Sequence, residues 1–522
     1  MRRILVCLAA LAALGAGLSS VPAAPAAQPS ADATRGTITW HACSTDVSLE
    51  GFECGTLTVP LDWDNLANPA NASIELAVRR GTSRDRIGAL TFNPGGPGES
   101  GLASAAGIHS VLPPKVRNRF DFVAWDPRGV GLTQPQLQGC LDAEKVVRRL
   151  AEPRADDTGP YTPPAVGPVD WMAFAQSQYT ALAAALPACL EVNKDVAPYL
   201  GTYYVIRDLE AMRKALGERQ WNFWGMSYGT RIGYRYAREF PNSFRTLLLD
   251  GSWSPNMTVT SWMNASSWNF ATAQAVFGSL FGKKMASTLQ QVIDGLDQRT
   301  ITVEGQVLTR WQILPQIFTN ISNQSAFPDI LDVIRMAYQG LYGKPTTRIL
   351  APLARLKARA DANPNTGLNL YYINCRDLAD YPTVEEIGRA AGIAAANNSV
   401  AAGSTAIIKG TLCAGLPQDF THGYSPLTKP LQLPTPPVVI NSLGDTRTEY
   451  DFGRTMANYL AGSSLVTYDS TQHVSYRTVP SACISAAVTP YFLSQTLPGT
   501  RLCPYAPIPS SDARTRAPSV GR

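Results

Sequence analysis

Segments with helix and strand patterns alternate between residues 203 and 249. Over residues 203–216, apolar side chains recur every three to four positions, the period of one helix face. Strand-length runs rich in apolar residues follow at 221–224 and 244–249, separated by a helical segment at 228–240. Such alternation favours a mostly parallel sheet with helices on both faces. The pattern therefore predicts an α/β fold.

The alternation extends in both directions along the chain and is interrupted once. It stops near Trp253, and residues 254–430 contain helical runs without intervening strands. We therefore expect one α/β core that is split by an inserted, mainly helical cap. The further predicted elements are strands at 57–63, 73–78, 89–92, 120–125, 437–441 and 465–468, and helices at 171–190, 450–460 and from about 481.

The first residues have the pattern of an export signal. Arg2 and Arg3 precede an apolar run over residues 4–18, and small residues up to Ala27 provide a cleavage site. The run is shorter than the ~20 apolar residues of a spanning helix, so we expect a secreted protein without a membrane span. The expected organisation is a signal peptide (1–27), a linker or short propeptide (28–35), the first part of the core (36–253), the cap (254–430), the second part of the core (431–503) and a disordered tail (504–522).

Cysteine, histidine and charge usage narrow the classes of function. Without Cys7 of the signal peptide, eight cysteines remain, an even number that suggests disulfides in an exported protein. More than about 100 pairings are possible, and pairing of neighbours along the chain is our working hypothesis. No C-x-x-C motif occurs and histidines are few, so we expect no metal or other cofactor. The net charge of +5 comes from scattered residues, which argues against a nucleic-acid partner.

Residues 225–229, Gly-Met-Ser-Tyr-Gly, match the G-x-S-x-G motif of a nucleophile elbow. This motif places a serine on a sharp turn between a strand and a helix. It is common by chance, but here the predicted strand 221–224 precedes it and the predicted helix 228–240 follows. Ser227 is therefore the predicted nucleophile, and a structural turn serine is the alternative.

Histidine is the usual base for such a serine. In folds with this elbow, the acid and then the base follow the nucleophile along the chain. His41 and His109 precede Ser227, and His422 lies inside the predicted cap. His473 follows the strand at 465–468 and precedes the last helix, so it is the predicted base.

The acid is expected on a loop that follows a strand between the nucleophile and the base. Asp445 follows the strand at 437–441, and Asp250 follows the strand at 244–249. Asp445 is favoured because its loop is the usual acid position, but Asp250 is also stereochemically possible. The carboxylate would hold the imidazole tautomer and stabilise the imidazolium.

A glycine-rich loop, residues 93–101, follows the strand at 89–92. Glycines let backbone N–H groups approach a developing oxyanion without interference from side chains. The predicted donors are the amides of Gly96, with Gly95 as the less favoured alternative, and of Tyr228, which follows the nucleophile. A phosphate-binding loop is disfavoured because no G-K-[ST] sequence follows.

These motifs together resemble one family. Residues 95–101 (GGPGESG), 126–131 (DPRGVG), 225–230 (GMSYGT), Gly444-Asp445 and His473 are similar to those of the secreted bacterial tripeptidyl aminopeptidases, which are relatives of prolyl aminopeptidase. The resemblance covers nearly the whole chain after the linker, and the stretch from about 410 looks like the family's terminal segment. It implies an α/β-hydrolase core with a helical cap, release of short peptides from free N-termini, and no metal.

The resemblance also implies a structural role for Asp126-Pro-Arg128, and two departures from the family pattern bear on substrate range. Glu99 stands where many relatives have a small residue. Thr471 and Gln472 precede the base where relatives tend to have glycines.

An aminopeptidase must bind a substrate ammonium, for which a desolvated carboxylate is the natural partner. The candidates are Glu99, Asp377, Glu385 and Glu386, each with a solvated or structural acid as the alternative reading. Two other functions stay open. A carboxylesterase or amidase with the same triad would not depend on a free amine, and a non-catalytic binding protein would usually lack a triad residue. The expected partners are peptides with a free N-terminus, and the oligomeric state is not predicted.

Overall fold

The computed structural model describes residues 36–140, 161–361 and 367–508. The predicted signal peptide, the linker and most of the predicted tail lie outside the described residues. Within the described part of the chain, no helix is both long and apolar enough to cross a membrane.

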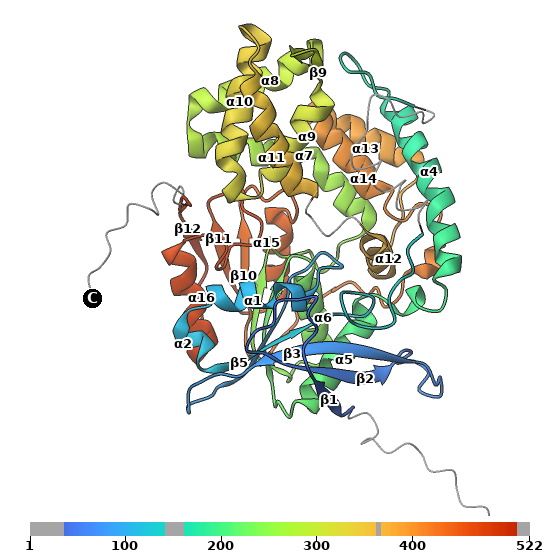
Figure 1. Ribbon diagram of the computed structural model, residues 1–522, viewed down its shortest axis with the longest axis vertical. Helices are drawn as coiled ribbons and strands as arrows, with labels where there is room; N and C mark the ends of the chain where they lie inside the picture. The colour runs from blue at the N-terminus through green and yellow to red at the C-terminus, as the bar shows by residue number, and fades with distance from the viewer. Residues whose placement is uncertain (1–35, 141–160, 362–366, 509–522) are drawn as a thin grey trace, which may run out of the picture.

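A ten-stranded sheet forms the lower half of the molecule in Figure 1. Its first three strands pair antiparallel, and the strands from β4 onward pair parallel to one another, which confirms the predicted mostly parallel sheet. In spatial order the strands are β1 (Ile38–His41), β2 (Glu53–Pro60), β3 (Asn71–Arg79), β5 (Phe120–Trp125), β4 (Gly88–Asn93), β6 (Trp221–Met226), β7 (Phe244–Asp250), β10 (Val438–Ser442), β11 (Ser464–Tyr468) and β12 (Arg501–Cys503).

One predicted strand is displaced along the sequence. The apolar run 57–63 predicted a strand that the structure places at residues 53–60, where eight residues pair with β3. The chain turns after Pro60, because the Leu61 amide donates to Ala70 O and the Asp62 side chain accepts from the Asp64 amide. Pairing with β3 thus decides the strand's extent more than its own apolar pattern.

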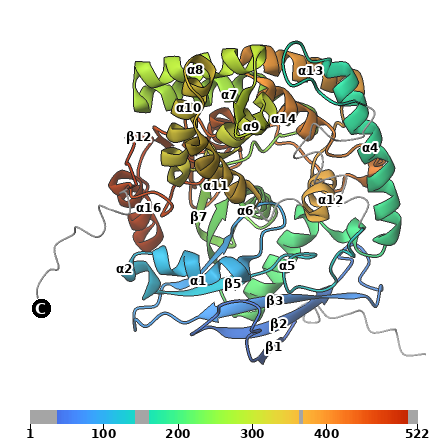
Figure 2. The ribbon, with the colours of Figure 1, turned by 45° about the horizontal axis from the view of Figure 1, so that its top comes forward.

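Helices cover both faces of the sheet, as the alternation predicts (Figure 2). Neighbouring residues of β6 point to opposite faces, so Phe223 packs into one apolar layer and Trp224 into the other. The first layer contains apolar side chains of α5 (Thr202–Ala215), α6 (Gly229–Glu239) and α15 (Tyr450–Tyr459), and the second those of α1 (Gly101–Val111), α2 (Pro114–Arg117) and α16 (Ala482–Ser494).

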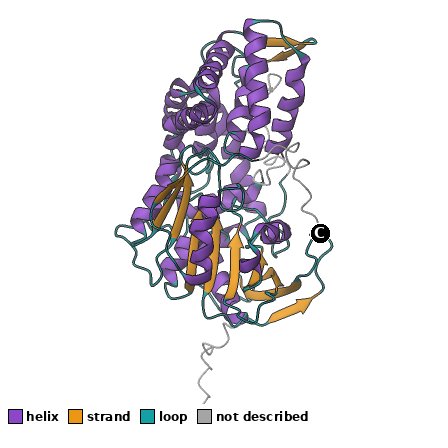
Figure 3. Ribbon diagram, turned by 90° about the vertical axis from the view of Figure 1, so that its left-hand side faces the viewer, coloured by secondary structure: helices purple, strands orange, loops and turns teal. Residues whose placement is uncertain are grey.

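A separate helical layer, the cap, lies above the sheet and has its own apolar core (Figure 3). It consists mainly of α7 (Val259–Phe281), α8 (Lys283–Gln298), the hairpin β8 (Ile301–Val303) and β9 (Gln306–Leu308), α9 (Arg310–Asn320), α10 (Phe327–Tyr342), α11 (Leu350–Asp361), α13 (Val384–Asn397) and α14 (Val400–Gly410). Short 3-10 turns lie at Ala197–Tyr199, Gln324–Ala326, Thr347–Ile349 and Gln418–Phe420.

The membership of the cap differs from the predicted insertion 254–430 in two respects. Helix α4 (Trp171–Val192), which falls in the predicted first part of the core, packs on α13, and its Phe174 belongs to the cap's apolar core. Conversely, α12 (Leu368–Asp377) and apolar residues between 412 and 427 do not join the cap. They pack into the same apolar layer as α5 and α6, against the sheet. An apolar helix face predicts burial, but it does not specify the partner.

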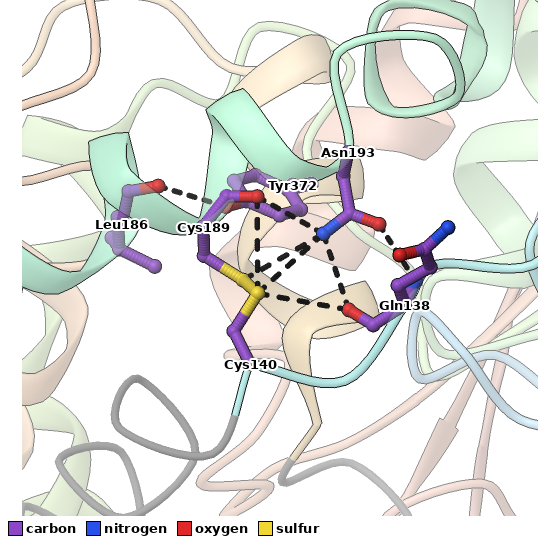
Figure 4. Close-up of a disulfide and its surroundings, with 6 residues drawn as sticks. All are labelled: Gln138, Cys140, Leu186, Cys189, Asn193 and Tyr372. Carbon is purple, nitrogen blue, oxygen red and sulfur yellow. Dashed lines mark hydrogen bonds between the residues drawn. A yellow bond between two sulfur atoms is a disulfide. The ribbon is translucent and has the colours of Figure 1, made fainter.

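The cysteines pair with their neighbours along the chain, as hypothesised: Cys43–Cys54, Cys140–Cys189, Cys375–Cys413 and Cys483–Cys503. The second disulfide, Cys140–Cys189, links the end of α4 to the segment that follows β5 (Figure 4). Asn193 reinforces this link, because its side-chain amide donates to Gln138 O at 3.1 Å and accepts from the Gln138 amide at 2.7 Å. The Tyr372 hydroxyl of α12 donates to Leu186 O, so α4 is also tied to α12.

Candidate active site

Ser227 occupies the turn between β6 and α6, as the motif predicts. Its φ of 53° is in the left-handed region, a strained conformation for a serine that is typical of a nucleophile elbow. The turn is tight, because a Cβ on Gly225 would lie only 2.4 Å from Gly229 O. The Ser227 amide donates to Asp250 O at 2.9 Å, which attaches the turn to the end of β7.

Asp445 and His473 lie on the loops that follow β10 and β11, and their side chains meet. His473 Nδ1 is 2.7 Å from Asp445 Oδ2, and the carboxylate is fully buried. Asp445 Oδ1 accepts from the amides of Arg447 and Thr448, so its orientation is defined by its own loop. A carboxylate accepts only, so the imidazole proton lies on Nδ1 and Nε2 is left to act as a base.

The structure distinguishes between the two predicted acids. Asp250 accepts the amides of Ser475 and Tyr476 at 2.9 and 2.8 Å, and it therefore supports the backbone of the base loop rather than the imidazole. Burial raises the pKa of Asp250 to about 6, against the effect of these two N–H donors. The end of β7 thus joins the nucleophile turn to the base loop, whereas Asp445 is the acid paired with His473.

Thr448 is a site residue that the sequence analysis missed. Its hydroxyl donates to Asp445 Oδ2 at 2.8 Å and lies 3.2 Å from His473 Nδ1. A threonine three residues after the acid belongs to none of the motifs considered, so only its position in a tight loop after β10 could have suggested it.

We expect Thr448→Val to lower kcat about tenfold, because a hydrogen bond to a charged group contributes about 1.5–3 kcal/mol and part of it is lost here. Steady-state kinetics on any substrate that the enzyme cleaves would measure the change. Thr448→Ser, which keeps the hydroxyl, is the matched control and should stay near the wild-type rate. If Thr448→Val has the wild-type kcat, the Thr448 hydroxyl does not support the Asp445–His473 pair.

The glycine-rich loop lies directly beside the nucleophile. A Cβ on Gly95 would lie 2.8 Å from Ser227 Cβ and 3.2 Å from the Tyr228 amide nitrogen. The Gly95 amide already donates to Asn93 Oδ1 at 3.0 Å, which favours the neighbouring Gly96 as the oxyanion donor. The Gly96 and Tyr228 amides therefore stay the proposed oxyanion hole.

The four acids predicted to bind an ammonium lie in different surroundings. Asp377 is buried and accepts from Tyr228 Oη at 2.6 Å and from the Thr202 amide, and it pairs with buried Arg231 at 3.3 Å. Its charge is already neutralised, which argues against the prediction that it binds a substrate ammonium. Its role is to hold the Tyr228 ring behind the nucleophile.

Glu385 and Glu386 lie at the exposed start of α13. Glu385 pairs with Arg389 one turn later, and Glu386 completes a capping box with Thr383. Both therefore stabilise the helix, and these local partners argue against their predicted role as substrate ligands. Glu99 lies half-buried on the glycine-rich loop, three residues after Gly96.

Asp126 and Arg128 have the structural role that the resemblance implied. Asp126 is buried and accepts from Ser100 Oγ and from the amides of Leu102 and Leu132, and burial raises its pKa. Arg128 donates to both carboxylate oxygens of Asp208 on α5. Asp126 thereby holds the start of α1 and the end of the glycine-rich loop, whereas Arg128 ties the turn after β5 to α5.

The sequence patterns of two protein families match this chain. The α/β hydrolase fold family matches residues 88–332, and the family of TAP-like proteins matches residues 398–503. The second match begins near the stretch that resembled the family's terminal segment. Together the two matches cover most core strands, part of the cap and the loops of Asp445 and His473.

Three relatives are informative. The chain is 31% identical to serine protease Hip1 of Mycobacterium tuberculosis over 475 residues, which cover 86% of each chain. It is 36% identical to tripeptidyl aminopeptidase of Streptomyces lividans over 238 residues, or 44% of this chain and 41% of that one. It is 28% identical to carboxylesterase B of Mycobacterium tuberculosis over 518 residues, or 93% and 92% of the two chains.

Proposed function

The chain belongs to the tripeptidyl aminopeptidase family of α/β-hydrolase serine peptidases, and on this premise we propose that it is a secreted exopeptidase that releases short peptides, typically tripeptides, from free N-termini. The observation that carries the chemistry is the 2.7 Å hydrogen bond between His473 and buried Asp445, on neighbouring loops of a sheet whose β6 ends in the Ser227 elbow. A non-catalytic scaffold would have no need for this pair.

In the proposed mechanism Ser227 attacks the scissile carbonyl while His473 Nε2 accepts its proton. Asp445 stabilises the imidazolium that forms, and the amides of Gly96 and Tyr228 hold the oxyanion. His473 then protonates the leaving amine. Water, activated by the same imidazole, hydrolyses the acyl-enzyme and restores the serine.

The exopeptidase mode is supported by the position of α12 over the glycine-rich loop. Asn369 of α12 donates to Gly129 O at 2.8 Å, and a Cβ on Gly98 would lie 3.0 Å from Asn369 Cβ. A covered site favours chain ends over internal segments. Glu99, on this same loop, is the carboxylate that we propose for the substrate ammonium.

The mode is tested with two chromogenic tripeptide anilides that differ only in acetylation of the amine. We expect the free amine to be cleaved with a kcat/KM about 100-fold higher, because acetylation leaves a desolvated carboxylate without its charged partner. Ser227→Ala serves as the blank for contaminating peptidases. Equal cleavage of both anilides would exclude recognition of a free N-terminus.

The variant Glu99→Gln tests whether Glu99 binds the substrate ammonium, separately from whether the enzyme is an exopeptidase. We expect it to raise KM for the free-amine anilide and to leave the slow cleavage of the acetylated anilide unchanged. If the free-amine preference survives in Glu99→Gln, another group binds the ammonium.

A carboxylesterase is the second candidate, because carboxylesterase B matches over nearly the whole of both chains. A carboxylesterase would use the same triad, and it would hydrolyse simple esters whether or not the substrate has a free amine. Cleavage of such esters with neither anilide cleaved would favour it.

Secretion is supported by four disulfides, since these form and persist in oxidising compartments.

A further inference from the structure

The turn that follows α9, residues 321–324, extends from the cap down to the catalytic loops. Ser322 is buried, and it contacts both loops. Its Oγ accepts the amide of Thr446 at 2.9 Å and lies 2.6 Å from the Thr446 hydroxyl, while its carbonyl accepts the amide of His473 at 2.8 Å. Thr446 directly follows the acid Asp445. One residue of the cap therefore hydrogen-bonds the base itself and the neighbour of the acid.

Thr471 and Gln472, which directly precede the base, bind the same turn. The Thr471 hydroxyl donates to Ile321 O, and Gln472 Oε1 accepts the amide of Gln324 at 2.7 Å. The amide group of Gln472 donates to His473 O at 2.6 Å. These two side chains thus bind the base loop to the cap.

The acid loop is also held at its other end by the cap. Glu449, which ends this loop, accepts from Lys409 Nζ of α14 at 3.0 Å and from Asn269 Nδ2 of α7 at 3.2 Å. Glu449 and Lys409 are both buried. Cap residues therefore contact the loop of Asp445 at Thr446, directly after the acid, and at Glu449, four residues after the acid.

We propose that Ser322 is a positioning residue for catalysis, which sets the separation of the Asp445 and His473 loops from the cap. The cap is then a fixed part of the acid–base geometry at this edge rather than only a cover that limits substrate access. Loss of the Ser322 hydroxyl would release Thr446, let the acid loop relax and lengthen the Asp445–His473 hydrogen bond. The proposal rests on the proposed acid and base roles of this pair and is independent of the exopeptidase mode.

The test compares Ser322→Ala with Ser322→Thr, which restores a hydroxyl, and with Ser325→Ala as a matched control. Ser325 is an exposed serine of the same segment, whose hydroxyl donates only within the turn, to Asn323 Oδ1. We expect Ser322→Ala to lower kcat about tenfold with KM within about twofold, because a positioning loss acts on the transition state. Ser322→Thr should recover most of the rate, and Ser325→Ala should match wild type.

The proton resonance of the His473 Nδ1–H adds a readout that a purely structural role would not move. The hydrogen bond to Asp445 holds this proton. If the bond lengthens in Ser322→Ala, the downfield resonance should move upfield, and the spectrum is recorded without substrate.

The outcomes separate this inference from the proposed function. A folded Ser322→Ala with wild-type kcat and Nδ1–H resonance overturns the positioning role. A lowered unfolding temperature with these two readouts unchanged does the same. If Asp445→Asn also keeps wild-type activity, the proposed mechanism fails, whereas loss of activity in Asp445→Asn alone leaves the mechanism intact and removes only the role of Ser322.

Discussion

Replacement of Ser227 by alanine is expected to lower kcat by about five to six orders of magnitude, the scale of nucleophile removal in serine peptidases. The fold should survive, because the turn is held by the hydrogen bond from the Ser227 backbone amide to Asp250 O, and alanine keeps this amide. Alanine also has no larger side chain than serine and accepts the same turn at similar cost.

Covalent labelling checks this prediction without assuming a substrate. A fluorophosphonate should add one adduct to the wild type, on the peptide that contains Ser227, and none to Ser227→Ala. Far-UV circular dichroism and the unfolding temperature should be alike for the two proteins. Labelling of the variant, or residual kcat near the wild-type value after repurification, would show that another residue is the nucleophile.

Asp445→Asn is expected to lower kcat about 10³- to 10⁴-fold. The asparagine amide would present an N–H donor or a neutral acceptor to His473 Nδ1, which favours the wrong imidazole tautomer and removes the charge that stabilises the imidazolium. Stopped assays at several pH values, with KM determined alongside, would measure the loss. KM should change little, because the carboxylate is buried and contacts the base rather than the substrate.

Asp250→Asn is the matched comparison, since Asp250 is equally buried and was the alternative acid. One of its two bonds to the amides of Ser475 and Tyr476 would be replaced by an N–H facing an N–H. We therefore expect a loss of about 1–3 kcal/mol in the free energy of unfolding and a much smaller effect on kcat. Equal losses of kcat in the two folded variants would contradict the assignment of Asp445 as the acid.

Local patterns predicted the core elements closely. The helix predicted at 203–216 lies at Thr202–Ala215, and the strand predicted at 244–249 lies at Phe244–Asp250. The strand, the serine and the following helix are contiguous, so a short stretch of sequence was enough to predict the elbow. The order of elements then sufficed to select His473 from four histidines, because the base loop must follow the strand after the acid.

The substrate-binding acids could not be predicted in this way. Asp377, Glu385 and Glu386 have the residue type that an ammonium requires, but type does not reveal a partner. The pairing of Asp377 with Arg231 joins segments 146 residues apart, as their backbone–side-chain contact also shows. Glu386 was a capping-box glutamate, a local signal that was present in the sequence and was passed over.

The sequence by itself determined the α/β core and the positions of the predicted nucleophile and base, because each depends on residues close together or on their order along the chain. Only the tertiary structure decided which aspartate meets His473, that α4 packs in the cap, and that Ser322 contacts both catalytic loops. The Asp445–His473 bond spans 28 residues and the Ser322–Thr446 contact spans 124. Such contacts arise when separate elements pack together, and no periodicity within either segment encodes them.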